Sequence, residues 1–282
     1  MSRREIAGLV VAITGGAGGL GTALARKLAD RGAKVALLDR DAHVAEKAAI
    51  GIDGPELVRG WDIDVRDSES LEHAFHAVAD HFGRIDVIVA NAAVMMFTSV
   101  ADQDPEAFAA TIDVNLTGVW RTFRAGIPHV EQTGGYLLAI SSMSAFGHQP
   151  LQGVYSASKA GVWALANVAR LELAPRGIGV GTLFPTFFDS PMVAEASAHP
   201  AAAKIWSARQ KWLGMLPTTT LDFAAGRAVK AISRRARTLT VRPDHWVVSR
   251  MPGLFQPYLD GLGWSPDAIR EATILVNSQA KR

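Results

Sequence analysis

Short runs of apolar residues alternate along this chain with longer stretches in which apolar residues recur at helical spacing. The run Val10-Val11-Ala12-Ile13 is continuous in its apolar character, which is typical of a strand in a parallel sheet that is buried on both faces. The amphipathic stretches between such runs supply helices that cover those faces. The pattern therefore predicts an α/β fold with one doubly wound parallel sheet.

The expected elements follow this alternation. Strands are predicted at residues 9–13, 34–38, 56–61, 86–90, 136–140 and 179–184, and helices at 19–30, 42–49, 68–81, 105 to about 130, 154–174 and 223–233. Sheets of this kind bind ligands at the carboxyl ends of their strands. We therefore expect the functional residues to lie directly after the strands.

Two segments depart from the alternation. Prolines 191, 200 and 217 interrupt residues 190–221 around Trp206 and Trp212, and we interpret this segment as a helical flap over the strand ends. Residues 249–282 form an extension rich in proline, glycine and aromatic residues, with no sustained amphipathic helical pattern. We expect one domain over residues 1–248, followed by an extension that packs against protein of the same or a neighbouring subunit, or closes the substrate site; contact with a membrane surface is the alternative.

Composition narrows the class of protein. Of 282 residues, 49% are hydrophobic and 20% are charged, with a formal net charge of +2, which is typical of a globular protein with one large core. No apolar run approaches the length of a membrane span and the start leads straight into the first strand, so neither a span nor a signal peptide is expected. Cysteine is absent, which excludes disulfides and favours a cytoplasmic protein. The basic cluster around Arg234 to Arg237 is interpreted as a solvated helix end and not a nucleic-acid contact.

A glycine-rich turn joins the first predicted strand to the first helix. Gly15, Gly19 and Gly21, with Leu20 between the last two, open that helix. Glycines at these positions let the backbone approach a pyrophosphate, which the helix N-terminus then binds. The turn predicts a Rossmann-type dinucleotide site.

Asp39 closes the second predicted strand, where a carboxylate accepts hydrogen bonds from the adenosine ribose hydroxyls. Its charge would repel the 2′-phosphate of NADP, so NAD is favoured. NADP remains an alternative because of Arg40, whose guanidinium is suited either to stack on the adenine or to bind the 2′-phosphate.

A tyrosine and a lysine four residues apart define the candidate reaction centre. Tyr155 and Lys159 lie on one face of the predicted helix, and Ser142 follows the fifth strand. We expect the ammonium group, together with a positive nicotinamide ring, to lower the pKa of the phenol. With the glycine turn, this centre predicts hydride chemistry on a nicotinamide cofactor.

These residues together resemble the short-chain dehydrogenase/reductase family over about residues 5–245. The motifs are Thr14-Gly15-x-x-x-Gly19-x-Gly21, Asp64-Val65, Asn91-Ala92-Ala93, Asn115, Ser142, and Tyr155 with Lys159. The resemblance implies a homodimer or homotetramer that oxidises alcohols or reduces ketones.

The same resemblance implies roles for individual residues. Tyr155 exchanges a proton with the substrate, Ser142 orients the substrate oxygen, Lys159 also holds the nicotinamide ribose, and Asn115 carries a water that links Lys159 to solvent. Asp64 and Val65 hold the adenine, Asn91 braces the central strands beside the cofactor, and Ser190 bonds the nicotinamide carboxamide. Ala92 and Pro185 are further cofactor-binding residues. Two positions depart from the family pattern: Ala93 replaces a glycine, and Thr186 replaces the glycine after Pro185.

The residues expected around the substrate are apolar. They are Met95, Met96, Met143, Phe146, Phe187, Phe188, Met192, Trp206 and Trp212. Such a set favours a hydrophobic secondary alcohol or ketone of steroid, terpenoid or lipid type, unless the aromatic residues only pack the flap. An NADP-dependent ketone reductase and a non-catalytic dinucleotide-binding regulator are the other functions considered. No cluster of His, Asp and Glu has the spacing of a metal site.

Overall fold

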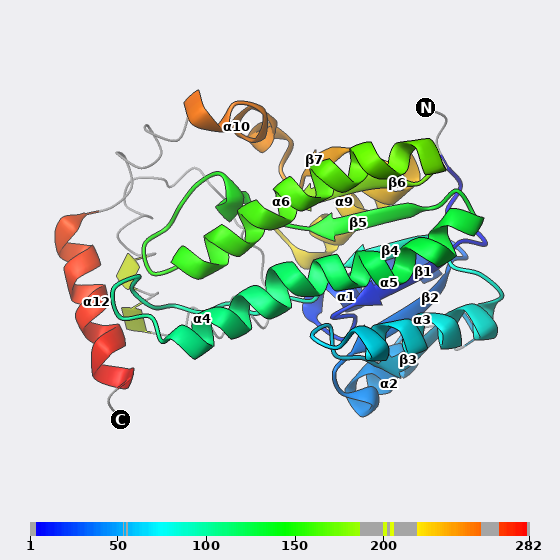
Figure 1. Ribbon diagram of the computed structural model, residues 1–282, viewed down its shortest axis with the longest axis horizontal. Helices are drawn as coiled ribbons and strands as arrows, with labels where there is room; N and C mark the ends of the chain where they lie inside the picture. Colours follow the sequence, from blue (N-terminus) through cyan, green and yellow to red (C-terminus); the bar gives the residue numbers. More distant parts are fainter. Residues whose placement is uncertain are drawn as a thin grey trace.

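A seven-stranded parallel sheet forms the centre of the computed structural model, which describes residues 4–52, 54, 56–186, 200–201, 204–205, 219–254 and 265–280. The strands are β1 (Val10–Thr14), β2 (Lys34–Asp39), β3 (Val58–Asp62), β4 (Val87–Ala90), β5 (Tyr136–Ile140), β6 (Gly179–Phe184) and β7 (Thr238–Thr240). They are ordered β3-β2-β1-β4-β5-β6-β7 (Figure 1). The predicted doubly wound α/β fold is confirmed, and its strand order reverses between β1 and β4, where such sheets bind their ligands.

Helices cover both faces of this sheet, as the apolar pattern predicted. The larger ones are α1 (Gly19–Ala29), α2 (Ala42–Ile50), α3 (Ser68–Phe82), α4 (Pro105–Ile112), α5 (Gly118–Gln132), α6 (Gly153–Leu173) and α9 (Leu221–Arg234). In Figure 1, α5 and α6 cross one face of the sheet, while α1 and α9 lie on the other.

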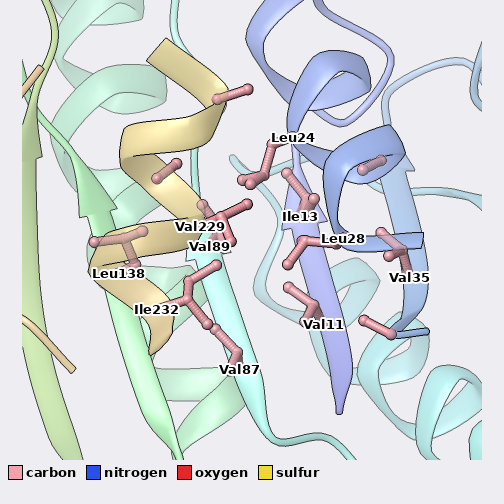
Figure 2. Packing of buried hydrophobic residues seen from close by; sticks show 14 of the residues in the cluster. Val11, Ile13, Leu24, Leu28, Val35, Val87, Val89, Leu138, Val229 and Ile232 are labelled. Carbon is pink, nitrogen blue, oxygen red and sulfur yellow. The ribbon is translucent and has the colours of Figure 1, made fainter. Parts of the chain in front are cut away.

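Two apolar clusters join these layers. Figure 2 shows one of them: Leu24 and Leu28 of α1 and Ile232 of α9 pack against strand residues such as Val11 and Val87. The second cluster fills the opposite face with side chains from α3, α5 and α6. Both faces of the central strands are therefore buried, which explains why their sequences are continuously apolar.

The helix predicted from residue 105 to about 130 is found as one uninterrupted helical stretch over residues 105–132, with a π turn inside it. Residues Asp113–Thr117 form this π turn between α4 and α5, and Asn115 lies at its middle. Insertions of this kind are rare and are frequent at functional sites. The helical periodicity of the sequence continues through the π turn, so it gave no sign of it.

The C-terminal extension contains a helix that was not predicted. After β7 come the short helices η4 (Pro243–His245) and α10 (Trp246–Arg250), and α12 (Pro266–Ala280) follows the undescribed residues 255–264. Ala272 and Val276 of α12 are buried in a small cluster with Leu151, Ala201 and Ile205. The expectation of no amphipathic helix in the extension was therefore wrong.

The position of α12 bears on the site. Figure 1 shows it at the end of the molecule toward which the arrow of β5 points. Lys204, from the region predicted to be a flap, forms an ion pair with Glu271 of this helix. The extension therefore packs against its own subunit, on the ligand-binding side of the sheet.

Two further sequence predictions have structural outcomes. In the basic cluster Arg234 and Arg237 are exposed, as predicted, whereas Arg235 is half-buried and its guanidinium donates to the carbonyl oxygens of Gly135 and Gly177 at 2.5 and 3.0 Å. Among the described residues, none of the helices has both the length and the apolar character that a membrane span requires.

Candidate active site

The glycine turn brings backbone atoms closer together than side chains would allow. Gly15 has a φ of +62°, and a Cβ on it would lie 2.7 Å from the Cα of Ala92. A Cβ on Gly21 would lie 2.6 Å from the carbonyl oxygens of Gly15 and Gly16. The N-cap residue of α1, Gly18, offers no side chain to the first N–H groups of the helix. These N–H groups and the helix dipole are therefore available to an anion such as a pyrophosphate.

Asn91 ties the ends of β1 and β4 together beside this turn. Its Nδ2 donates to the carbonyl oxygens of Thr14 and Gly15 at 3.0 and 2.9 Å. In return, the Thr14 hydroxyl accepts from the backbone N–H of Asn91 at 3.1 Å. These bonds fix the point where the strand order reverses, and they give Asn91 and Ala92 a fixed position next to the turn.

Asp39 faces the glycine turn from the end of β2. One carboxylate oxygen accepts from the N–H of Ala17 at 3.0 Å, and the other accepts from the N–H of Arg40 at 2.9 Å. The carboxylate is thus held half-buried at the edge of the turn, where the ribose of a bound dinucleotide is expected. The side chain of Arg40 is exposed.

Asp64 is held by a residue that was not predicted, Arg66. The guanidinium donates to both carboxylate oxygens, with Nε 3.0 Å from each. This pairing is the main reason that the pKa of Asp64 lies below its usual value, and Arg40 adds a smaller effect. The sequence Asp64-Val65-Arg66 indicates this pairing, because a carboxylate and a guanidinium two residues apart in a turn are able to meet. Val65 is buried and packs against the start of α5 at Gly118.

Ser142 follows β5, and Tyr155 lies in the first turn of α6. The Ser142 hydroxyl accepts from the N–H of Ser144 at 3.1 Å, which fixes its orientation. Burial raises the pKa of Tyr155, and the nearby Ser142 hydroxyl opposes that rise. The expected lowering of this pKa is therefore not found in the free protein, because desolvation of the phenolate is the larger effect.

Lys159 lies beside the same phenol but deeper in the molecule. It is 2% exposed, its Nζ donates to the carbonyl oxygen of Ile140 at 3.1 Å, and it lies 5.7 Å from the centre of the Tyr155 ring. Burial lowers the pKa of Lys159 to about 8. The neighbouring Ser141 donates to the carbonyl oxygen of Lys159 at 2.7 Å, which fastens α6 to the end of β5.

Asn115 uses its side chain to connect other elements. Its amide oxygen accepts from the N–H of Val94 at 2.8 Å, and its Nδ2 donates to the carbonyl oxygen of Val94 at 2.9 Å and to Ser158 at 3.2 Å. Ser158 is the residue before Lys159. Asn115 thus joins the π turn, the segment after β4 and the helix of the reaction centre.

The residues predicted around the substrate do not all lie together. Met95 lies in the segment after β4, and the N–H of Met143 donates to the carbonyl oxygen of Pro185 at 2.8 Å. Phe146 is 1% exposed and packs against Phe184 and Trp163, so it contributes to the core and not to a substrate surface. Five of the residues predicted around the substrate fall outside the described part of the chain, namely Phe187, Phe188, Met192, Trp206 and Trp212, as does Ser190, which was predicted to bind the cofactor.

Comparison with known proteins identifies the family. A family model described as short chain dehydrogenase matches residues 9–201. An NADP-dependent (R)-specific alcohol dehydrogenase of Lentilactobacillus kefiri is 33% identical over 67% of this chain and 77% of the relative. An uncharacterized NAD-dependent oxidoreductase of Mycobacterium tuberculosis is 34% identical over 66% of this chain and 74% of the relative. The crystal structure of gox2181 is 26% identical and superposes with a TM-score of 0.73, covering 87% of this chain and 97% of that one.

The chain belongs to the short-chain dehydrogenase/reductase family. It is an oxidoreductase that uses a nicotinamide dinucleotide and acts on CH–OH groups. Its relatives include an NADP-dependent and an NAD-dependent enzyme. The comparisons therefore give a nicotinamide dinucleotide as the cofactor without distinguishing NAD from NADP.

Proposed function

We propose that this protein transfers a hydride between NAD(H) and a hydrophobic secondary alcohol or ketone, with Ser142, Tyr155 and Lys159 as its reaction centre. The observation that carries the proposal is the Lys159 amine 5.7 Å from the centre of the Tyr155 ring, with the Ser142 hydroxyl close enough to influence the same phenol. The three side chains lie at the carboxyl end of β5, the side of the sheet on which the glycine turn also lies.

The bound cofactor accepts or supplies the hydride. The turn formed by Gly15, Gly19, Leu20 and Gly21 would hold the pyrophosphate. This role fits the glycines at positions 15 and 21, where neighbouring backbone atoms lie too close for a side chain. Asp39 would bind the adenosine ribose, Asp64 and Val65 the adenine, Lys159 the other ribose, and Pro185 and Ser190 the carboxamide. Asn91 and Ala92 would support the cofactor from the end of β4.

Proton transfer falls to Tyr155. Because burial raises its pKa, the free protein carries the neutral phenol, which is the form that donates a proton to a ketone oxygen. In alcohol oxidation, the phenolate takes the hydroxyl proton while the hydride leaves the carbinol carbon. The Ser142 hydroxyl donates to the substrate oxygen as negative charge develops on it, and the Lys159 ammonium stabilises the phenolate.

Asp39 supports NAD as the cofactor. A half-buried carboxylate at the ribose position accepts hydrogen bonds from a 2′-hydroxyl and repels a 2′-phosphate. An NADP-dependent ketone reductase is the second candidate, favoured by the exposed guanidinium of Arg40 and by the similarity to the NADP-dependent alcohol dehydrogenase of Lentilactobacillus kefiri. A non-catalytic regulator is disfavoured, because both Tyr155 and Lys159 are present.

The substrate and the assembly are inferred from apolar side chains. Met143 follows Ser142 in sequence, the Met95 sulfur lies 3.1 Å from the amide nitrogen of Gln152 at the start of α6, and neither side chain carries a charge, which supports an apolar substrate. Phe108, Trp120 and Leu171 expose 43%, 45% and 65% of their surfaces on α4, α5 and α6. Such exposed side chains support a homodimer or homotetramer, which native mass measurement will test.

A panel of alcohols tests the function. The protein is mixed with NAD or NADP and with apolar secondary alcohols or small polar sugars, and absorbance of the reduced cofactor is followed. The proposal expects higher kcat/KM with NAD and with the apolar alcohols. Preference for sugars would refute the substrate class, and preference for NADP would select the second candidate.

A further inference from the structure

A buried amide near the reaction centre has an atom without a partner. Gln152 is 1% exposed, and its Oε1 has no hydrogen-bond partner among the described residues. Its Nε2 contacts only the Met95 sulfur, at 3.1 Å. Rotating the amide by 180° exchanges oxygen and nitrogen and still leaves one of them unsatisfied. Such a group is costly to bury, so an unsatisfied one calls for a physical explanation.

Gln152 lies at the start of the helix that carries Tyr155 and Lys159. Gln152 is the N-cap residue of α6, yet its side chain makes no capping bond. It lies three residues before Tyr155 in the chain. Its amide instead reaches the segment after β4, where it meets Met95.

The backbone around Gln152 is held in this arrangement by strained and paired residues. Leu151 has a φ of +65°, in the left-handed region that residues other than glycine rarely adopt. The N–H of Thr98 donates to the carbonyl oxygen of Leu151 at 2.9 Å, and Thr98 and Gln152 form an isolated parallel bridge. Strain of this kind persists where the surrounding structure fixes it, and it is frequent at ligand-binding sites.

We propose that Gln152 binds a second hydroxyl group of the substrate, on a carbon close to the reacting carbinol. A hydroxyl both donates and accepts, so it satisfies the free end of the amide in either orientation. The substrate class is then an apolar secondary alcohol with a neighbouring hydroxyl, or the corresponding hydroxyketone. This inference rests on the proposed function and adds a specificity-determining residue to it.

A matched pair of substrates tests the inference. 1-Phenyl-1,2-ethanediol differs from 1-phenylethanol by one hydroxyl next to the carbinol. Wild-type protein should show about tenfold higher kcat/KM for the diol than for 1-phenylethanol, because the alcohol without the second hydroxyl leaves the buried Gln152 amide unpaired. In Gln152→Met, which keeps the side-chain length and removes the amide, the ratio of the two values should fall to about one.

Gln103→Met is the matched control. The Gln103 amide also contacts a methionine sulfur, that of Met96 at 3.5 Å, but it lies in the loop before α4. Its substitution should leave the substrate ratio unchanged. An equal ratio in wild type and Gln152→Met, with both alcohols oxidised, would overturn the inference and leave the proposed function standing. Failure of the wild-type protein to oxidise either alcohol with NAD or NADP would count against both.

Discussion

Replacing Asp39 by asparagine removes one charge at the predicted ribose site and keeps the size of the side chain. The asparagine oxygen is still able to accept from the N–H of Ala17, which Asp39 binds at 3.0 Å. The glycine turn should therefore keep its shape. What changes is the repulsion of a 2′-phosphate, which is the physical basis of the proposed preference for NAD.

Coulomb's law gives the size of this effect. Two unit charges about 4 Å apart interact by about 1 kcal/mol in water and about 4 kcal/mol at an effective dielectric constant near 20. Asp39 is half-buried, so its repulsion falls between these limits. NADP affinity should rise by roughly 5- to 1000-fold in Asp39→Asn. NAD affinity should fall by a few-fold, because hydrogen bonds to a charged acceptor are stronger than those to a neutral one.

The assay measures Kd for both cofactors by titration calorimetry at two salt concentrations. Asp41→Asn is the control, because Asp41 is two residues away but caps α2 by accepting from the N–H groups of His43 and Val44. This control changes the net charge equally and should alter the ratio of NADP to NAD affinity little. If Asp39→Asn leaves that ratio at the wild-type or control value, the carboxylate does not select the cofactor.

Three further outcomes are expected. Gly15→Ala should weaken NAD binding at least tenfold, because its Cβ meets the backbone of the turn, whereas Gly83→Ala, with a φ of +87° and open space, should cost stability without changing Kd. Because burial lowers the pKa of Lys159 to about 8, the unfolded chain binds more protons than the folded protein above that pH. The free energy of unfolding of the wild type relative to Lys159→Met, measured in urea, should therefore rise by about 2 kcal/mol between pH 7 and 10. No change in this difference would contradict a buried ammonium. Ala272→Asp places a charge in a fully buried position of α12 and should increase proteolysis of the C-terminal extension. Ile274→Asp, at a position 61% exposed, is the control and should not increase it. Equal cleavage of the two variants would argue against the packing of α12.

Much of the fold follows from local patterns in the sequence. Continuous apolar strands and amphipathic helices specify the layers, and the glycine turn locates the first crossover. The centre of Tyr155, Ser142 and Lys159 is predictable because a helix spacing and the end of a strand both fix its geometry. The family resemblance then supplied roles that these spacings alone do not give.

Other features depend on long-range contacts that no local pattern reveals. The π turn at Asn115 is stabilised by bonds to Val94 and Ser158, which lie far from it in sequence. Phe146 packs into the core because Phe184 and Trp163 surround it. The sign of the pKa shift of Tyr155 depends on the depth of the phenol in the folded chain. Two missed features had a local signal: Asp64 and Arg66 lie two residues apart in a turn, and Ile269, Ala272 and Val276 of α12 recur at helical spacing after Ser265-Pro266.

The central claim is that the Tyr155 phenol exchanges the substrate proton. The most direct measurement is kcat of Tyr155→Phe on an alcohol that the wild type oxidises, together with its Kd for NAD. Turnover should fall by about a thousandfold, as is usual for the loss of a key acid or base, while Kd stays within a few-fold. Tyr136→Phe is the control, because the Tyr136 hydroxyl donates to the carbonyl oxygen of Ala236 at 2.7 Å and lies at the opposite end of β5 from Ser142; its kcat should remain near the wild-type value. Turnover by Tyr155→Phe at a rate close to wild type would contradict the mechanism.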